Sequence, residues 1–342
     1  MLRPTINDLA DAAGVSLATV DRVLNSRPGV RQVTVDRVNQ AVEKIGFVRD
    51  PFAAGLARKR DFRVIAFVPK GDGQFLTEVC SAVQKTAQAA KADRVDLLLQ
   101  QFEADDPHAL AAPLDMITPD SVDGVVIMGF ETPPLRDAVR RLRARGVATV
   151  AIISDLPNSG VDFFIGINNL AAGRTAGALM GKMLHGPGAK VAVMTSSLQA
   201  WDSLDRRLGF DRAIAEGFPQ IEVLATVEGH DDPVILDAAL RRVLSAHPDV
   251  QGIYSMGGGN RVLLGVLTEL GLIGKIRIIA HELTETTREG LRRDQLDAVI
   301  TQDLGHIIRS AIRTLRATRD QRPIMAEQER IRIEILVKDN LD

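Results

Sequence analysis

The sequence predicts a small all-α unit at the N-terminus, followed by a two-lobed α/β body whose lobes are doubly wound parallel sheets. Three observations support this prediction. Apolar residues in the first 50 positions recur at helical spacing around a glycine. From Phe62 onward, short β-branched runs alternate with longer helical patterns, which is typical of parallel sheets with helices on both faces. This alternation restarts near residue 166, which indicates a second lobe.

The composition is that of a globular chain. Its 342 residues are 45% hydrophobic and 25% charged, enough for two or three domains. The single cysteine, Cys80, excludes an intramolecular disulfide. No apolar run approaches the roughly 20 residues that span a bilayer, and no basic segment followed by an apolar run opens the sequence. We therefore expect a cytoplasmic protein with no membrane partner.

Charge is distributed unevenly along the chain. Residues 1–60 contain ten basic and six acidic side chains, so they carry +4, and the remaining residues carry −6 of the total of −2. A basic unit attached to an acidic body suits a polyanionic partner for the small unit. An ordinary fluctuation in surface charge is the alternative interpretation.

The first two helices follow from their caps. Thr5 can cap a helix that ends at Gly14, and Ser16 can cap a second helix after a very short turn. Two helices joined so closely must cross at a steep angle. This is the geometry of a helix-turn-helix, in which the second helix enters the DNA major groove.

The exposed first turn of the second helix, together with Arg22 one turn later, would read bases. Arg22 can bind guanine in bidentate fashion, whereas short polar or cationic neighbours can contact phosphates. A small helical pair with no DNA partner is the alternative. The side chains expected to contact DNA are Thr5, Ser16, Leu17, Ala18, Thr19, Arg22, Asn25 and Arg31.

A third amphipathic helix is expected over residues 33–45, capped near Thr34, and "GFVRDPFAAGLARKR" follows it. With this context the sequence resembles the LacI/GalR family of bacterial transcription regulators. The motifs that carry the resemblance are "TINDLADAAGVSLATVDRVLN", "PGV", "VEKIGF" and the segment ending in "GLAR". The resemblance implies a ligand-controlled regulator, most simply a homodimeric repressor bound to a palindromic double-stranded DNA operator.

The resemblance also implies a hinge helix over residues 51–58, with Leu56 as a wedge in the minor groove. An apolar wedge unstacks a base step and kinks the duplex. Two residues depart from the family pattern. Asp21 stands where serine or threonine is common, which leaves the base preference open. Gly55 costs a helix about 1 kcal/mol relative to alanine, so we expect the hinge to depend on DNA for folding.

Buried strands are expected in both halves of the body. Those of the first lobe are "RVIAFVP", "VDLLLQ", "VDGVVIMG" and "VATVAIIS"; those of the second include "KVAVMT", "IEVLATV", "GIYSM" and "IRIIAHE". From the resemblance, the strand "DAVITQD" returns the chain to the first lobe and "RIRIEILVK" belongs to the second. The expected domains are residues 1–50, a linker over 51–61, a first subdomain of 62–165 with 297–325, and a second of 166–296 with 326–342.

The body resembles the sugar-binding core that such regulators share with periplasmic sugar-binding proteins of type I. Ligands of doubly wound sheets bind at the carboxyl ends of the strands, so a cleft between the lobes is the expected site. By position, Phe75 would lie on a sugar face or anchor the core, and Asp155 would accept bonds from hydroxyls or cap a turn. Arg206 would bind sugar oxygens or be a surface charge beside Arg207.

Four further residues are candidates by the same resemblance. Gln302 would bind ligand or form a hydrogen bond across the lobes, and Trp201 would stack on a sugar or pack under its loop. Glu282 replaces the usual aspartate, with His281 where an aromatic often lies. Asn260 falls one position from the family's ligand asparagine. A sugar or polyol is the expected effector class, with purines and sugar phosphates as alternatives.

Other function classes fit the sequence less well. A solute-binding transport protein would match the body, but the N-terminal unit opposes it. No serine or cysteine lies in a nucleophile elbow, and the six histidines lack metal-ligand spacing. "SMGGGN" lacks the lysine of a phosphate-binding loop. We therefore expect no enzyme, no cofactor and no metal. No leucine-heptad tail follows Asp342, so we expect a dimer rather than a tetramer.

Overall fold

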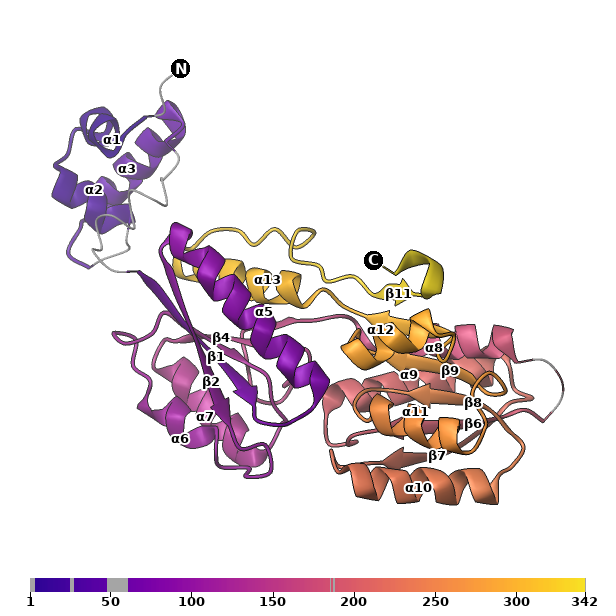
Figure 1. The fold of residues 1–342 in the computed structure, drawn as a ribbon. Helices are drawn as coiled ribbons and strands as arrows, with labels where there is room; N and C mark the ends of the chain where they lie inside the picture. The colour runs from indigo at the N-terminus through magenta and orange to yellow at the C-terminus, as the bar shows by residue number, and fades with distance from the viewer. Residues whose placement is uncertain (1–3, 25–27, 48–60, 185, 187, 342) are drawn as a thin grey trace. The chain divides into compact units, whose positions relative to one another are not determined.

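The computed structural model describes residues 4–24, 28–47, 61–184, 186 and 188–341, and the chain divides into two compact units after Asp61. The N-terminal unit contains α1 (Ile6–Ala13), α2 (Leu17–Leu24) and α3 (Gln32–Ile45) (Figure 1). Its core is formed by the apolar faces of all three helices, among them Leu9, Val20 and Val38. The helical spacing in the sequence therefore predicted the correct buried faces.

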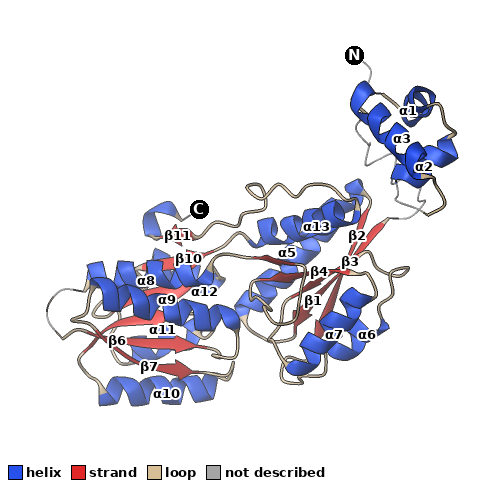
Figure 2. Cartoon of the chain, turned by 180° about the vertical axis from the view of Figure 1, so that it is seen from behind, coloured by secondary structure: helices blue, strands red, loops and turns tan. Residues whose placement is uncertain are grey.

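The first lobe of the body is a five-stranded parallel sheet in the order β2-β1-β3-β4-β5. Helices α5 and α13 cover one face of this sheet, and α6 and α7 cover the other (Figure 2). Its elements are β1 (Phe62–Pro69), α5 (Gln74–Ala90), β2 (Val95–Phe102), α6 (Ala111–Met116), β3 (Gly124–Ile127), α7 (Pro133–Ala144), β4 (Ala148–Ile152), β5 (Phe163–Ile165) and α13 (Leu304–Arg319).

The second lobe is a six-stranded sheet in the order β11-β10-β9-β8-β6-β7, parallel except for β11. Helices α8 and α9 pack on one face, and α10, α11 and α12 on the other. Its elements are α8 (Asn169–Met183), β6 (Lys190–Thr195), α9 (Trp201–Gly217), β7 (Glu222–Glu228), α10 (Pro233–Ala246), β8 (Val250–Ser255), α11 (Asn260–Glu269), β9 (Arg277–His281), α12 (Glu285–Arg292), β10 (Ala298–Thr301) and β11 (Glu334–Leu336).

One expectation about the crossing strands is wrong. The strand within 297–303 does not join the first lobe, because β10 pairs in parallel with β9 of the second sheet. The chain crosses after this strand, and α13 then packs on the first lobe, where Leu315 lies against Gly124 of β3. The last strand, β11, pairs with β10 as the sequence predicted for the second lobe.

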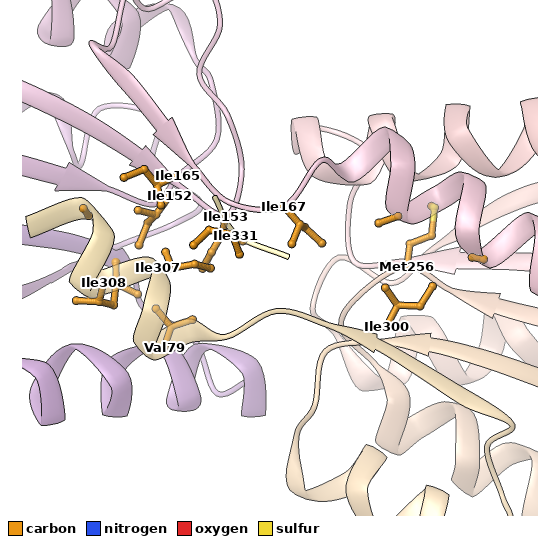
Figure 3. Close-up of a cluster of buried hydrophobic side chains, with 14 of the residues drawn as sticks. Val79, Ile152, Ile153, Ile165, Ile167, Met256, Ile300, Ile307, Ile308 and Ile331 are labelled. Carbon is orange, nitrogen blue, oxygen red and sulfur yellow. The ribbon is translucent and has the colours of Figure 1, made fainter. Parts of the chain in front are cut away.

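One apolar core extends across both lobes where the chain passes between them. Ile152, Ile165 and Ile307 of the first lobe belong to the same buried cluster as Met256 and Ile300 of the second (Figure 3). The lobes are therefore joined by packed side chains as well as by the crossing chain, which holds the carboxyl ends of their strands near one another. No helix in the described part of the chain is long and apolar enough to cross a membrane.

Glycines allow α8 and α9 to pack closely. A Cβ atom added at Gly173 would lie 2.0 Å from the carbonyl oxygen of Arg206, and one at Gly209 would lie 2.1 Å from that of Leu170. Such approaches leave no room for a side chain at either glycine, so the backbone of each helix packs directly on a glycine of the other. This contact sets the position of α9 and with it the position of Arg206.

We expect Gly173→Ala to lower the free energy of unfolding by about 1–3 kcal/mol, because overpacking forces the two helices apart. Gly265→Ala is the matched control. Gly265 also lies in a helix, but a Cβ atom there has nothing within 4 Å, so alanine should stabilise the protein by up to about 1 kcal/mol. Urea unfolding followed by circular dichroism measures both changes; similar effects at the two positions would contradict the close-packing account.

Candidate functional site

The N-terminal unit presents the first turn of α2 to solvent. Ser16 precedes the helix, and its hydroxyl accepts a hydrogen bond from the backbone N–H of Thr19 at 3.2 Å. Gly14 adopts the left-handed conformation, φ 61°, that ends α1 and directs the chain into the turn. Val20 is buried in the core, whereas Leu17 is 48% exposed and Arg22 is exposed. This helix therefore buries one face and leaves a second face for a partner.

The other residues predicted to contact DNA differ in exposure and in their position relative to the helices. Thr5 is exposed and forms a capping box with Asp8, as its cap role predicted. Ala18 is exposed and Thr19 half-buried. Arg31 is exposed and precedes α3, which begins at Gln32, so the predicted cap at Thr34 is wrong. Asn25 and Leu56, with the linker over 51–60, lie outside the described residues.

The body contains a fully buried charge pair at the carboxyl ends of its strands. Arg206 of α9 is 1% exposed and Glu282, directly after β9, is 4% exposed. The Nη2 atom of Arg206 donates to Oε1 of Glu282 at 2.9 Å, Nη1 donates to the carbonyl of Met256 at 2.7 Å, and Nε donates to Oδ1 of Asn169 at 2.9 Å. Each guanidinium nitrogen has a protein partner, so the alternative of Arg206 as a surface charge is wrong.

Burial raises the pKa of Glu282, and the neighbouring guanidinium of Arg206 opposes that rise. The backbone of Glu282 is left-handed, φ 68°, and so is that of Ile153 after β4, φ 69°. Non-glycine residues, and β-branched ones above all, are strained in this region. Both strained residues lie at the carboxyl edge of a sheet, where a doubly wound fold binds its ligand.

His281 and Asn260 surround this pair with further buried polar groups. The ring Nε2 of His281 is 2.8 Å from the hydroxyl of Tyr254, whose ring stacks on Phe210. The amide nitrogen of Asn260 donates to the carbonyl of His281 at 3.3 Å, and its Oδ1 accepts from the hydroxyl of Ser255 at 2.7 Å. Both predicted residues therefore support the loop that carries Glu282.

Gln302 and Phe75 line a cavity of about 290 Å³ together with Glu282. The amide nitrogen of Gln302 donates to Oε1 of Glu282 at 3.3 Å, but its Oε1 atom is buried and has no hydrogen-bond partner in the described part of the chain. A buried acceptor without a partner is costly unless a ligand or water donates to it. Phe75 is half-buried and also packs on the apolar core, so the structure is compatible with both of its predicted roles.

Asp155 and Trp201 lie where the lobes meet. Among the described residues, Oδ1 of Asp155 accepts one hydrogen bond, from the backbone N–H of Leu156 at 2.7 Å. Trp201, the first residue of α9, donates from Nε1 to Oε2 of Glu131 in the first lobe at 2.6 Å. The Glu131 side chain is 4% exposed and also accepts from the backbone N–H of Asn158. Trp201 thus bridges the lobes, and its stacking on a sugar stays a prediction.

The sequence reasoning missed several residues of this site: Glu131, Asn169, Asp202, Asp205 and Tyr254. Asn169 and Tyr254 lie inside apolar runs, where a polar residue is a signal of a buried hydrogen bond. Glu131 lies in a loop, and Asp202 and Asp205 lie in the polar first turns of α9, where acidic side chains carry no such signal.

Burial lowers the pKa of His281 well below its ordinary value of 6.5, with Arg206 adding to the effect. The unfolded chain therefore binds a proton that the folded protein does not, so His281 lowers stability as the pH falls below about 6.5. Between pH 7.5 and pH 5.5 we expect wild type to lose about 1.4 kcal/mol more than His281→Gln, which cannot titrate. Urea unfolding at the two pH values measures this difference, and equal losses would contradict it.

Comparison with family models gives two matches. Residues 5–50 match the model of bacterial regulatory proteins of the lacI family, and residues 65–321 match a periplasmic binding protein domain. Among curated proteins, the chain is 27% identical over 161 residues to catabolite control protein A of Streptococcus mutans, covering 46% of this chain and 47% of that protein. It is 34% identical over 125 residues to the maltose regulon regulatory protein MalI of Escherichia coli, covering 36% of this chain and 35% of MalI. The match therefore spans a third to a half of these relatives.

A longer match reaches the HTH-type transcriptional regulator GntR of Pseudomonas aeruginosa, 25% identical and covering 74% of this chain and 71% of that protein. Among solved structures, a solute-binding protein from Burkholderia graminis in complex with D-arabinose superposes with a TM-score of 0.73 at 25% identity, covering 82% of this chain and 96% of that one. A putative LacI transcriptional regulator from Bacteroides fragilis gives 0.72 at 17% identity, covering 83% and 99%, which shows the shared fold.

Proposed function

Because the chain belongs to the LacI family of bacterial regulatory proteins and carries a periplasmic binding protein domain, we propose that it is a ligand-controlled DNA-binding transcription regulator. It binds a two-fold operator as a homodimer, and its ligand is a small polyhydroxylated molecule held between the lobes of the body. The observation that carries the proposal is the exposed first turn of α2, which follows a well-capped turn and takes no part in the core of its own unit.

The chemistry of that turn suits the major groove. Leu17 and Ala18 present short apolar groups that can contact a thymine methyl, and Arg22 can bind the O6 and N7 atoms of guanine. Ser16, Thr19 and Arg31 suit phosphates, which fix the register of the helix without reading sequence. A homodimer would place two such helices on two half-sites, so the operator would mirror the symmetry of the protein.

The body supplies the ligand site. The periplasmic binding protein fold supports ligand binding at the carboxyl edges of the two sheets, as does the strained backbone of Ile153 and Glu282. The Oε1 atom of Gln302, which has no hydrogen-bond partner among the described residues, supports it as well. A ligand held by both lobes favours one arrangement of them. It changes DNA binding only if it binds the DNA-competent arrangement with a different affinity from the other one.

Selection from a random duplex DNA library tests the first half of this proposal. We expect full-length protein to enrich a palindromic site, with a specific affinity at least about a thousandfold above that for unrelated duplex. Leu17→Asp is expected to abolish the enrichment, because a carboxylate in the groove repels phosphates. The assignment of α2 as the recognition helix would be overturned if the protein enriches no site. It would also be overturned if Leu17→Asp enriches the same site as wild type.

A further inference from the structure

Four carboxylates lie on segments that meet between the two lobes. Glu131 and Asp155 follow β3 and β4 of the first lobe, and Asp202 and Asp205 lie in the first turns of α9 in the second. Two hydrogen bonds hold these segments together: Trp201 donates to Glu131 at 2.6 Å, and the backbone N–H of Asp202 donates to the hydroxyl of Ser154 at 3.4 Å.

The same carboxylates act on one another electrostatically. Burial raises the pKa of Asp155, and the charge of Glu131 raises it further. Burial likewise raises the pKa of Asp205, with additional effects from Asp202 and from Asp155 of the opposite lobe. Like charges brought together out of water are unfavourable unless a cation joins them.

The described part of the chain supplies little compensating charge to this group. Arg206 is 3.8 Å from Asp202, but its three nitrogens already serve Glu282, Asn169 and Met256. Arg136 reaches Glu131 only at 4.0 Å. Asp155 accepts one backbone hydrogen bond, and no hydrogen bond or ion pair to Asp205 occurs among the described residues.

The neighbouring cavity is acidic as well. It is lined by Glu282, Asp303 and Glu334, by Phe75 and by Gln302, and no lysine or arginine lines it. Gln302 is 4% exposed, and its Oε1 atom is an acceptor with no partner in the described residues. Arg206 links this cavity to the four carboxylates, because it contacts both Glu282 and Asp202. Both parts of the site therefore offer acceptors and negative charge.

A metal ion does not fit this arrangement. Within the described ranges, no three histidine, cysteine, aspartate or glutamate side chains are grouped closely enough to hold one. The missing partner must instead span several acceptors, and it must combine positive charge with hydrogen-bond donors. An organic cation with hydroxyl groups has both properties.

We propose that the ligand of the cleft is a polyhydroxylated amine, such as an amino sugar, whose ammonium group binds among Asp155, Asp202 and Asp205 while its hydroxyls donate to Gln302 and Glu282. This inference rests on the proposed function, because it concerns the same cleft. The site rejects phosphorylated sugars and sugar acids, because their negative charge meets carboxylates and none of the described residues that line the cavity is a lysine or arginine.

Calorimetric titration of full-length protein with matched sets of probes tests the inference. Each set contains a neutral pentose, hexose or polyol, its amino counterpart, and its phosphate or uronate counterpart. D-Glucose, D-glucosamine, glucose 6-phosphate and glucuronate form one such set. We expect the best-binding set to favour the amine at least tenfold over the neutral compound, with no binding of the anionic one.

Two variants test which carboxylates bind the ammonium group of the ligand. Asp155→Asn and Asp205→Asn are each expected to weaken amine binding at least tenfold and to weaken binding of the neutral counterpart by a smaller factor, because a hydroxyl carries no charge for the carboxylate to attract. Asp249→Asn is the control: this carboxylate pairs with Lys190 at the amino end of β6, the opposite edge of the sheet from the site, so binding should not change.

Preferred binding of a neutral or anionic probe, or no binding within any set, would overturn the inference, and neither result depends on whether the variants fold. The proposed function is tested separately by the operator selected from the duplex library. If a neutral sugar binds best and changes operator affinity, the amine inference is wrong and the proposed function as a regulator still holds. If the protein prefers the amine but selects no operator, the proposed function as a regulator is wrong and the amine inference still holds.

Discussion

Replacing Arg206 with methionine is expected to lower the free energy of unfolding of the body by about 3–5 kcal/mol, because it leaves the carboxylate of Glu282 buried without its partner. Two further acceptors, the carbonyl of Met256 and Oδ1 of Asn169, also lose their donor. This is the largest effect on stability that we expect from a single side chain in the body. Urea unfolding of the variant measures it.

Two matched variants separate burial from charge. Arg174 forms an ion pair with Glu216 at 2.7 Å on the surface, so Arg174→Met should lower the free energy of unfolding far less than Arg206→Met does. Adding Glu282→Gln to Arg206→Met should restore part of the loss, because the remaining partner is then neutral. If Arg206→Met costs no more than Arg174→Met, the buried pair does not organise the site.

Replacing Arg22 with alanine is expected to weaken binding to the selected operator by about 1–3 kcal/mol per unit, if the guanidinium binds guanine in bidentate fashion. Two units on one palindrome double the loss to about 2–6 kcal/mol, which makes this the largest expected effect on DNA recognition. Fluorescence anisotropy with the operator and with unrelated duplex measures the ratio of specific to non-specific affinity.

The exposed Lys44 near the end of α3 provides the control, because Lys44→Ala removes the same charge from the same unit. We expect Lys44→Ala to weaken binding to the operator and to unrelated duplex by the same small factor, so that the ratio of the two affinities is unchanged, as loss of a phosphate contact does. If Arg22→Ala keeps the wild-type ratio of specific to non-specific affinity, Arg22 does not read bases.

The N-terminal unit was predictable from sequence because its structure is local. Thr5, Gly14 and Ser16 act within one turn of their own position, and the spacing of Leu9 and Val20 sets the buried faces. The start of α3 was predicted too late. Threonine is a common cap, but here Arg31 takes the extended cap conformation without any side-chain hydrogen bond.

The body was predictable as two α/β lobes, but the allocation of its crossing strands was not. Whether β10 pairs with the first or second sheet depends on partners far away in sequence, and no residue within the strand specifies them. The same limit applies to the site. Arg206 and Glu282 were both candidates, but their mutual burial depends on the glycine contact between α8 and α9 and on the left-handed turn after β9.

The proposed function requires that ligand binding in the cleft and DNA binding at α2 be coupled. The most direct test is the affinity of full-length protein for its selected operator, measured with and without a saturating concentration of the probe that binds the cleft most tightly. The account predicts a change of at least about tenfold, equivalent to about 1.4 kcal/mol, and an equal change in probe affinity when operator is present. A probe that binds equally well with and without operator, and leaves operator affinity unchanged, would contradict it.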